Sequence, residues 1–210
     1  MVSIRPATEK DIEQIVSVHV RAFEGFFLTL MGRAFLDELY RSFIVEEDGT
    51  CIVAETRDRI VGFAAGTLHP ERFFRKLKRK RWHIFLLRSL GSVLRRPFRV
   101  TRKLIGALSY KGDQPLSHTD AALLSSIAVD PDFSGEGFGQ SLLNAFCDKA
   151  RNGGIDYVYL TTDRDNNERT IRLYEKFGFE LENTFTQPGK RVMNRYLLSL
   201  GSTEDSTREK

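Results

Sequence analysis

The segment from Leu123 to Gln140 decides the fold, and it reads Leu-Leu-Ser-Ser-Ile-Ala-Val-Asp-Pro-Asp-Phe-Ser-Gly-Glu-Gly-Phe-Gly-Gln. Its first part, residues 123–129, is typical of a strand, and residues 130–132 (Asp-Pro-Asp) end it. Glycines let a backbone approach a ligand closely, and the unpaired N–H groups at a helix N-terminus attract anions. The helix that follows has its apolar positions on one face: Leu142, Leu143, Phe146, Cys147 and Ala150. The segment therefore predicts a strand–loop–helix unit that can hold a phosphate.

Two nucleotide-binding motifs are excluded for this loop. A Rossmann Gly-x-Gly-x-x-Gly beginning at Gly135 would need a glycine at position 140, where Gln140 stands. A Walker A loop would need Gly-Lys-Ser/Thr, which the chain lacks here. From the pattern alone, a plain loop-and-cap role for the glycines stays open.

Elements on both sides of this unit predict a single α/β domain with helices on both faces of one sheet. The element order is β-α-α-β-β-insert-β-α-β-α-β-β. Gly178 is a plausible C-terminal cap, and Thr8 to Asp11 form a capping-box pattern. The predicted helices are 9–23, 32–44, the one after the glycine loop and 167–177, and the predicted strands are 2–6, 51–56, 60–68, 123–129, 157–162, 179–185 and 190–199.

Three signatures in this order resemble the GNAT acyltransferase superfamily. They are the strand Ser126-Ile-Ala-Val-Asp-Pro131, the glycine loop, and the distal motif Asn167-x-x-Thr-Ile-x-Leu-Tyr174-Glu-Lys-Phe-Gly178-Phe179. Residues 123–180 match at motif level, and residues 1–68 and 120–199 match in element order. The resemblance implies the acyl-CoA N-acyltransferase fold, a mixed, mostly antiparallel sheet flanked by helices. It also implies an N-acetyltransferase that moves an acetyl group from acetyl-CoA, its cosubstrate, to a primary amine.

The resemblance also implies which residues would act. The strand backbone at 127–129 would hold the pantetheine arm and the acetyl carbonyl, and the amides of 135–140 would bind the pyrophosphate. Asn167 would contact the cofactor through its side chain, and Tyr174 would be the catalytic residue that protonates the departing thiolate. No metal site is expected. The cofactor-binding residues implied in this way are Ile127, Ala128, Val129, Gly135, Glu136, Gly137, Phe138, Gly139, Gln140 and Asn167.

Two positions depart from the family pattern. Ser134 stands where the family has Arg or Gln, and Ser125-Ser126 stand where many members have a glutamate. An amine of pKa ~10.4 is neutral only about once in 2,500 at pH 7, so a base or a water chain is expected to help. The candidate bases are Glu55, His69, His118 and Asp120, and none is singled out.

The charge of the chain is unevenly distributed. Its 210 residues are 41% hydrophobic and 29% charged, with a formal net charge of +4. Residues 71–112 contain fourteen Lys and Arg and one acid, Glu71, so this segment carries +13 and the rest carries −9. Interleaved apolar residues predict two or three amphipathic helices, broken near Gly91 and Pro97. We therefore expect one domain of residues 1–200. Residues 71–117 would form a basic helical insert between its third and fourth strands. Residues 201–210 are expected to be a disordered tail.

Several partners remain open at this stage. The basic face could be solvated, or it could bind an anionic partner, either a phosphorylated acceptor or an anionic membrane surface. Nucleic acid is disfavoured because no recognition module is present. The acceptor could be an amino sugar, a small-molecule amine or a peptide amine, and a homodimer is compatible with the pattern. A non-catalytic acyl-CoA-binding or interaction module is the alternative function.

A cytoplasmic location is expected, and peripheral attachment to a membrane through the insert is left open. No signal peptide begins the chain, and no apolar run approaches the ~20 residues of a membrane span. Cys51 and Cys147 are expected to be reduced and buried, because two cysteines make neither a disulfide framework nor a zinc site.

Overall fold

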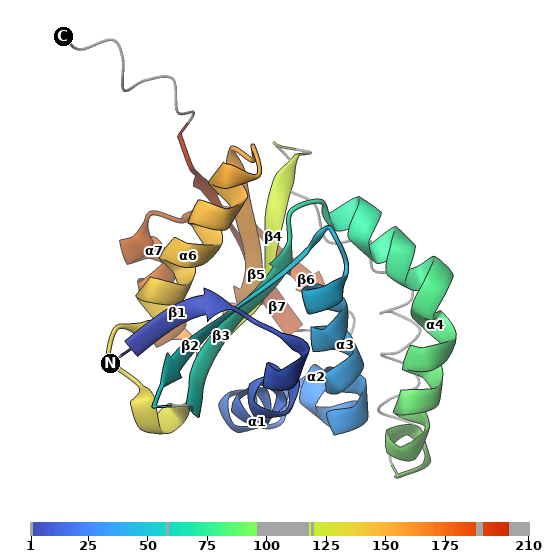
Figure 1. Cartoon of the computed structure of the whole chain (residues 1–210). Coiled ribbons are helices and arrows are strands. Elements are labelled where there is room, and N and C mark those ends of the chain that lie inside the picture. Colours follow the sequence, from blue (N-terminus) through green and yellow to red (C-terminus); the bar gives the residue numbers. More distant parts are fainter. Residues whose placement is uncertain (1, 58, 96–117, 119, 188–190, 202–210) are drawn as a thin grey trace, which may run out of the picture.

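One sheet runs through the computed structural model, which describes residues 2–57, 59–95, 118, 120–187 and 191–201 (Figure 1). Its seven strands lie in the order β1-β2-β3-β4-β5-β7-β6. Among these strands only β4 and β5 pair in parallel. The predicted mixed, mostly antiparallel sheet is confirmed. The strands are β1 (Val2–Pro6), β2 (Gly49–Thr56), β3 (Arg59–Thr67), β4 (Ala121–Val129), β5 (Tyr157–Asp163), β6 (Glu180–Gln187) and β7 (Arg191–Ser199).

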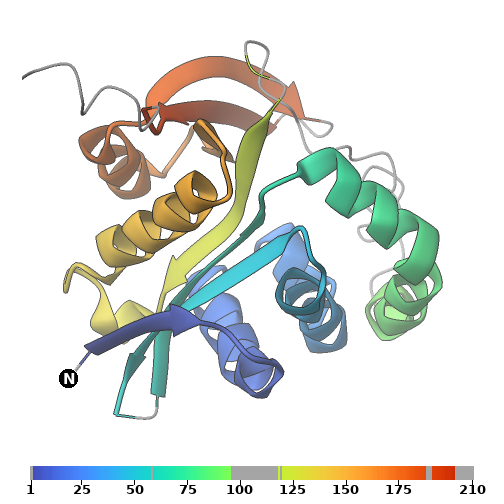
Figure 2. The same cartoon turned by 45° about the horizontal axis from the view of Figure 1, so that its top comes forward.

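Helices cover both faces of this sheet. In Figure 2, α6 and α7 lie on one face, whereas α1 and α3 lie on the other. The described helices are η1 (Glu9–Asp11), α1 (Ile12–Ala22), α2 (Phe27–Leu30), α3 (Arg33–Val45), α4 (Pro70–Arg95), η2 (Pro131–Phe133), α6 (Phe138–Asn152) and α7 (Glu168–Phe177).

The two apolar clusters of the core follow the alternation of side chains along the strands. On β2, Ile52 and Ala54 belong to the cluster under α6, whereas Cys51 and Val53 belong to the cluster under α1 and α3. Successive side chains of a strand point to opposite faces, so one strand feeds both clusters. Both Cys51 and Cys147 are buried free thiols, as expected.

The N-terminal half differs from the sequence prediction at one place. No helix was predicted between 9–23 and 32–44, but a helical turn, α2, lies there. Two contacts stabilise the turn: the Thr29 hydroxyl donates to the Phe23 carbonyl at 2.6 Å, and Met31 is fully buried. The predicted capping box is present, with the Thr8 backbone N–H donating to the Asp11 carboxylate at 2.7 Å.

The described part of the insert is a single helix, α4, which runs through Gly91 to Arg95. The predicted break at Gly91 is therefore wrong. One glycine inside a helix costs about 1 kcal/mol relative to alanine, which a long helix packed on its neighbour tolerates. The packing is visible in Phe73, whose ring stacks on that of Phe43 in α3 with 4.9 Å between centroids.

Some predicted features lie outside the described residues. They are the insert beyond Arg95, including the break near Pro97, and the tail after Gly201. None of the helices within the described ranges is both long enough and apolar enough to cross a membrane.

Candidate functional site

The parallel strands β4 and β5 separate halfway along β4, and this opening organises the site. Pairing between them covers only Ala121–Leu124, opposite Tyr157–Leu160. Beyond Leu124 the register between β4 and β3 shifts, so that Ser125 is an extra residue in a β-bulge. Residues 127–129 therefore lie on a part of β4 that pairs with β3 but, in the described chain, not with β5. Their backbone polar groups on the β5 side are available to a ligand.

A close approach of the neighbouring strand accompanies the bulge. A Cβ atom on Gly66 in β3 would stand 2.1 Å from the Leu123 carbonyl oxygen and 2.8 Å from the Phe146 ring. No larger residue fits at this position without moving a backbone. Gly66 thus lets β3, β4 and α6 meet where β4 begins to bend away from β5.

The glycine loop lies at the far end of β4 and opens α6. Gly135 and Gly137 have φ of +95° and +84°, which is backbone that favours glycine. The first helical hydrogen bond runs from the Ser141 N–H to the Gly137 carbonyl, so the amides at the start of α6 have no carbonyl of a preceding turn to bond. This arrangement fits the anion-binding role expected of 135–140.

The loop is tied to the opposite layer by a buried carboxylate. Asp130, which is 2% exposed, receives hydrogen bonds from Arg21 of α1 at 2.8 Å and Arg59 of β3 at 3.0 Å. It also accepts from the Asp132 N–H at 3.1 Å. These contacts hold the start of the loop in place.

An arginine that the sequence prediction did not include lies beside the loop. The Arg169 Nη2 atom is 3.7 Å from the position that a Cβ on Gly135 would occupy. Arg169 is exposed and stands near the N-terminus of α7, two residues after Asn167. It brings a cation to the loop in which Ser134 replaces the family's Arg or Gln. In the sequence, the feature that could have identified Arg169 is its position within the distal motif.

Asn167 connects the end of β5 to the start of α7. Its Nδ2 donates to Thr162 Oγ1 at 2.7 Å and to the Asp163 carbonyl at 3.0 Å. The predicted contact with a cofactor stays a prediction, because these bonds already use the side-chain N–H groups. They position the α7 N-terminus next to the opening.

Tyr174 lies on α7 within the core cluster under α6. It is 5% exposed, and its ring packs against Phe179 and Tyr196 with centroids 5.8 Å and 6.3 Å away. No described residue hydrogen-bonds its hydroxyl. Burial raises the pKa of Tyr174, so the hydroxyl stays protonated at physiological pH and can donate a proton or a hydrogen bond.

A chain of polar side chains lies on the other face of β4. His19 Nδ1 of α1 is 2.5 Å from the Tyr40 hydroxyl of α3. Burial raises the pKa of Tyr40 well above its ordinary value, and a hydrogen bond with the side chain of Ser126 opposes this shift. His19 and Tyr40 are buried, and Ser126 is 9% exposed. The three residues thus link α1 and α3 to β4, just after its bulge.

The state of His19 follows from its surroundings. Burial lowers the pKa of His19 to about 4, so the ring is neutral at pH 7. Its Nε2 is buried without a partner in the described part of the chain. A buried lone pair without a donor costs less free energy than a buried N–H without an acceptor. We therefore place the proton on Nδ1, which then donates to Tyr40.

Three segments that are distant in the sequence meet at the end of β5. The Arg191 guanidinium at the start of β7 lies 5.3 Å from the centroid of the Phe26 ring and pairs with Asp163 at the end of β5. The segment 26–28 thus approaches the end of β5. Phe26 is 41% exposed, which leaves part of its ring for a ligand.

None of the candidate bases lies at residues 127–129. Glu55 lies in β2, which pairs with β1, and its carboxylate accepts a hydrogen bond from Arg5 at 2.7 Å. His118, whose ring stacks on Tyr157 at 3.7 Å, and Asp120 precede β4, at the paired end of that strand. His69 follows β3 at the same end, since Thr67 is opposite Leu123.

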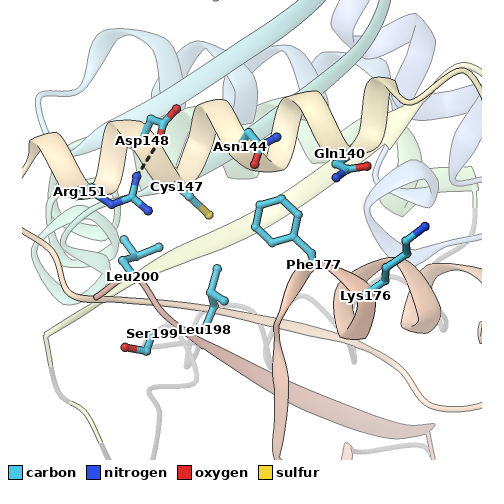
Figure 3. Close-up of a pocket in the computed structure, with 10 residues that line it drawn as sticks. All are labelled: Gln140, Asn144, Cys147, Asp148, Arg151, Lys176, Phe177, Leu198, Ser199 and Leu200. Atoms are coloured by element: carbon cyan, nitrogen blue, oxygen red, sulfur yellow. Dashed lines mark hydrogen bonds and ion pairs between the residues drawn. The ribbon is translucent and has the colours of Figure 1, made fainter. Parts of the chain in front are cut away.

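A hollow of about 360 Å³ lies between α6, α7 and the end of β7 (Figure 3). It shares only Gln140 with the predicted cofactor-binding residues. Among the described residues, no group of His, Cys, Asp and Glu side chains is arranged to hold a metal. The hollow is lined by Gln140, Asn144, Cys147, Asp148, Arg151, Lys176, Phe177, Leu198, Ser199 and Leu200.

Comparison with known proteins agrees with this geometry at two levels. Over 60 residues, 29% of this chain, it is 40% identical to the [ribosomal protein bS18]-alanine N-acetyltransferase of Escherichia coli, and the match covers 40% of that protein. Over 58 residues, 28% of this chain, it is 40% identical to the mycothiol acetyltransferase of Nocardiopsis dassonvillei, and the match covers 17% of that protein. The chain thus spans less than half the length of the curated relatives it matches.

Solved structures extend the likeness to the whole fold. The crystal structure of the Escherichia coli ribosomal-protein-S18-alanine N-acetyltransferase superposes with a TM-score of 0.62 at 15% identity, covering 100% of both chains. The polyamine N-acetyltransferase of Drosophila melanogaster gives 0.60 at 18% identity, covering 95% of this chain and 100% of the other. Residues 89–179 match the model of the acetyltransferase (GNAT) family. The matched segment contains the glycine loop and the distal motif, and the chain has the fold of these GNAT acetyltransferases.

Proposed function

We propose that this protein is an N-acetyltransferase that moves an acetyl group from acetyl-CoA to a primary amine. The observation that carries the proposal is the opening between β4 and β5, with the glycine loop and Tyr174 on one face and Ser126 on the other. A thioester held along 127–129 from the first face would leave the second face for the amine. Two substrates that must meet at one carbon need such opposite approaches.

The residues of the chain divide the chemistry between them. The amine nitrogen bonds to the carbonyl carbon while the carbon–sulfur bond breaks, and the Tyr174 O–H gives its proton to the departing thiolate. A backbone N–H near 127–128 meets the charge on the carbonyl oxygen. Tyr174 is reprotonated from solvent, which also takes the proton lost by the amine.

The Ser126 hydroxyl is proposed to orient the acceptor amine. Its hydrogen bond with Tyr40 holds it in place, and its oxygen keeps a lone pair for an amine N–H. His19 and Tyr40 are positioning residues in this scheme. Together these residues take the place of the glutamate that many family members carry.

The test is release of free thiol from acetyl-CoA over a panel of amines. The panel contains amino sugars, small-molecule amines such as polyamines, and peptides with a free N-terminal alanine, since the matched relatives include enzymes named for alanine and polyamine acetylation. Turnover with at least one amine supports the proposal. Binding of acetyl-CoA without turnover on any amine would favour the alternative, a non-catalytic acyl-CoA-binding module.

The basic side chain beside the loop gives one prediction for the donor. Arg169→Gln should raise the KM for acetyl-CoA roughly tenfold and leave kcat nearly unchanged, because an exposed charge-assisted contact to phosphate contributes about 1–2 kcal/mol to binding. The matched control is Arg151→Gln, which removes the same charge at the other end of α6. Equal KM values for the two variants would show that Arg169 does not contact the donor.

The polar chain on the acceptor face gives a second prediction. Ser126→Ala should lower kcat/KM for the amine roughly tenfold without changing the KM for acetyl-CoA. Ser126→Thr keeps the hydroxyl and should restore most of the activity. If the Ala and Thr variants lose activity equally, the hydroxyl does not orient the amine, and the loss comes from packing at the bulge.

A further inference from the structure

Six of the nine basic side chains of α4 fall into two groups. Those of the first group face α3 and the turn before β2, where carboxylates neutralise them. Arg81 pairs with Glu38 at 2.7 Å and Glu46 at 3.2 Å, and burial of Glu38 (2% exposed) makes this a closed contact. The other pairs of this group are Arg88–Glu38 at 3.7 Å, Lys76–Glu46 at 3.2 Å and Arg72–Asp48 at 3.8 Å. Much of the charge of the described insert is therefore used to dock α4 on its own domain.

The second group faces away from the domain. Arg75, Arg79, Trp82 and Leu86 are spaced i, i+4, i+7 and i+11, which puts them on one stripe of the helix. Within the part of the chain that the structure describes, Arg75 and Arg79 make no ion pair. Trp82 is 52% and Leu86 44% exposed, and the adjacent Leu87 is 67% exposed. We call these four stripe residues with Leu87 the outer face of α4.

Among the described elements, none covers this face of the helix. In Figures 1 and 2, α4 lies beside α3 at the edge of the molecule, away from the glycine loop before α6. No acid occurs in the sequence between Arg72 and Lys111, so no like-charge repulsion would oppose an anionic partner along this segment. A partner can therefore cover the outer face without blocking the donor side of the proposed site.

We propose that the outer face of α4 docks on an anionic lipid surface, with the helix lying in the plane of the interface. An indole is favoured at the boundary between headgroups and acyl chains, where its apolar ring and polar N–H are both accommodated. The two leucines enter the acyl boundary, and the unpaired guanidinium groups meet lipid phosphates. Nucleic acid would use the same arginines and could stack a base on Trp82, but it offers nothing to the two exposed leucines. The inference does not depend on acetyl transfer.

Trp82 is the single tryptophan of the chain, so its fluorescence reports on this face without a label. The experiment adds vesicles of phosphatidylcholine alone, or with 30–40% phosphatidylglycerol, to the full chain at low and at high salt (a composition of the order used to mimic anionic membranes). We expect a blue shift and protection from acrylamide quenching with the anionic vesicles, together with co-sedimentation. Phosphatidylcholine vesicles should give neither, and high salt should weaken both effects.

Two double variants locate the surface. Arg75→Gln/Arg79→Gln should lower the vesicle partition coefficient roughly 30-fold, because each basic side chain near an anionic bilayer contributes about a fivefold factor. Lys10→Gln/Lys149→Gln removes the same charge from exposed positions on η1 and α6 and should leave partitioning within about twofold of wild type. Circular dichroism and thermal unfolding should match wild type for both variants, since all four side chains are exposed.

Four results would overturn the inference. They are no co-sedimentation with anionic vesicles at low salt, equal losses in the two double variants, an indole protected from acrylamide before any lipid is added, and binding of an oligonucleotide in place of vesicles. Vesicle partition is measured without acetyl-CoA. Failure here is thus separate from failure of the proposed acetyl transfer, which the thiol assay reports.

Discussion

Tyr174→Phe should lower kcat for thiol release roughly 100-fold or more and leave the KM for acetyl-CoA nearly unchanged. The phenol donates a proton to the leaving thiolate in the proposed mechanism, and general acid catalysis typically contributes about 10²–10⁴-fold. The ring stays in the variant, so its packing against Phe179 and Tyr196 is retained. The folded state should lose little stability, because no described residue bonds the hydroxyl.

The control for this prediction is Tyr196→Phe. It removes the same atom from a neighbouring tyrosine of the same cluster, one whose hydroxyl lies 3.3 Å from Glu175. We expect kcat for this control to remain within about threefold of wild type. Equal turnover of the two variants would remove Tyr174 from the catalytic machinery.

Gly66→Ala should be the most destabilising small substitution among the described glycines that have an ordinary φ. Its Cβ would stand 2.1 Å from the Leu123 carbonyl oxygen, so a strand backbone must move. We expect a loss of about 3 kcal/mol in the free energy of unfolding and a fall in Tm of roughly 6–12 °C. Urea denaturation and a thermal scan measure both quantities.

The matched control for Gly66 is Gly139→Ala. There the new Cβ meets only the flexible end of Leu173, at 3.3 Å, and alanine is favoured inside a helix. We expect the free energy of unfolding to stay within about 1 kcal/mol of wild type. If Gly66→Ala unfolds at the same urea concentration as this control, the β4 bulge is not held by the contact at Gly66.

Local signals in the sequence predicted most of the elements. The apolar periodicity after the glycine loop predicted α6, and Gly178 ends α7 in the left-handed conformation at φ +107°, as expected of a cap. The boundaries of β4 and β7 differ from prediction by two residues and one residue at their starts. The signals failed at Gly91, where the helix continues through the glycine, and at α2, where packing on neighbouring elements outweighs local preference.

The prediction for the donor side of the site depends on contiguous residues. The loop and the distal motif each occupy a short stretch, so their residue types identify them without knowledge of the fold. Arg169 was missed because its relevance depends on α7 lying against the loop. The route from His19 through Tyr40 to Ser126 joins three elements far apart in the chain, and the sequence contains no local signal for it.

The sequence by itself determined the resemblance to the GNAT family, the order of the elements and the concentration of positive charge in one insert, because each of these depends on contiguous residues. Only the tertiary structure decided where β4 leaves β5, which side chains meet at Ser126, and which arginines of α4 are neutralised. These depend on the register of neighbouring strands and on carboxylates of α3 about forty residues away from their partners. A residue's charge is thus a property of the sequence, whereas its availability is decided by packing.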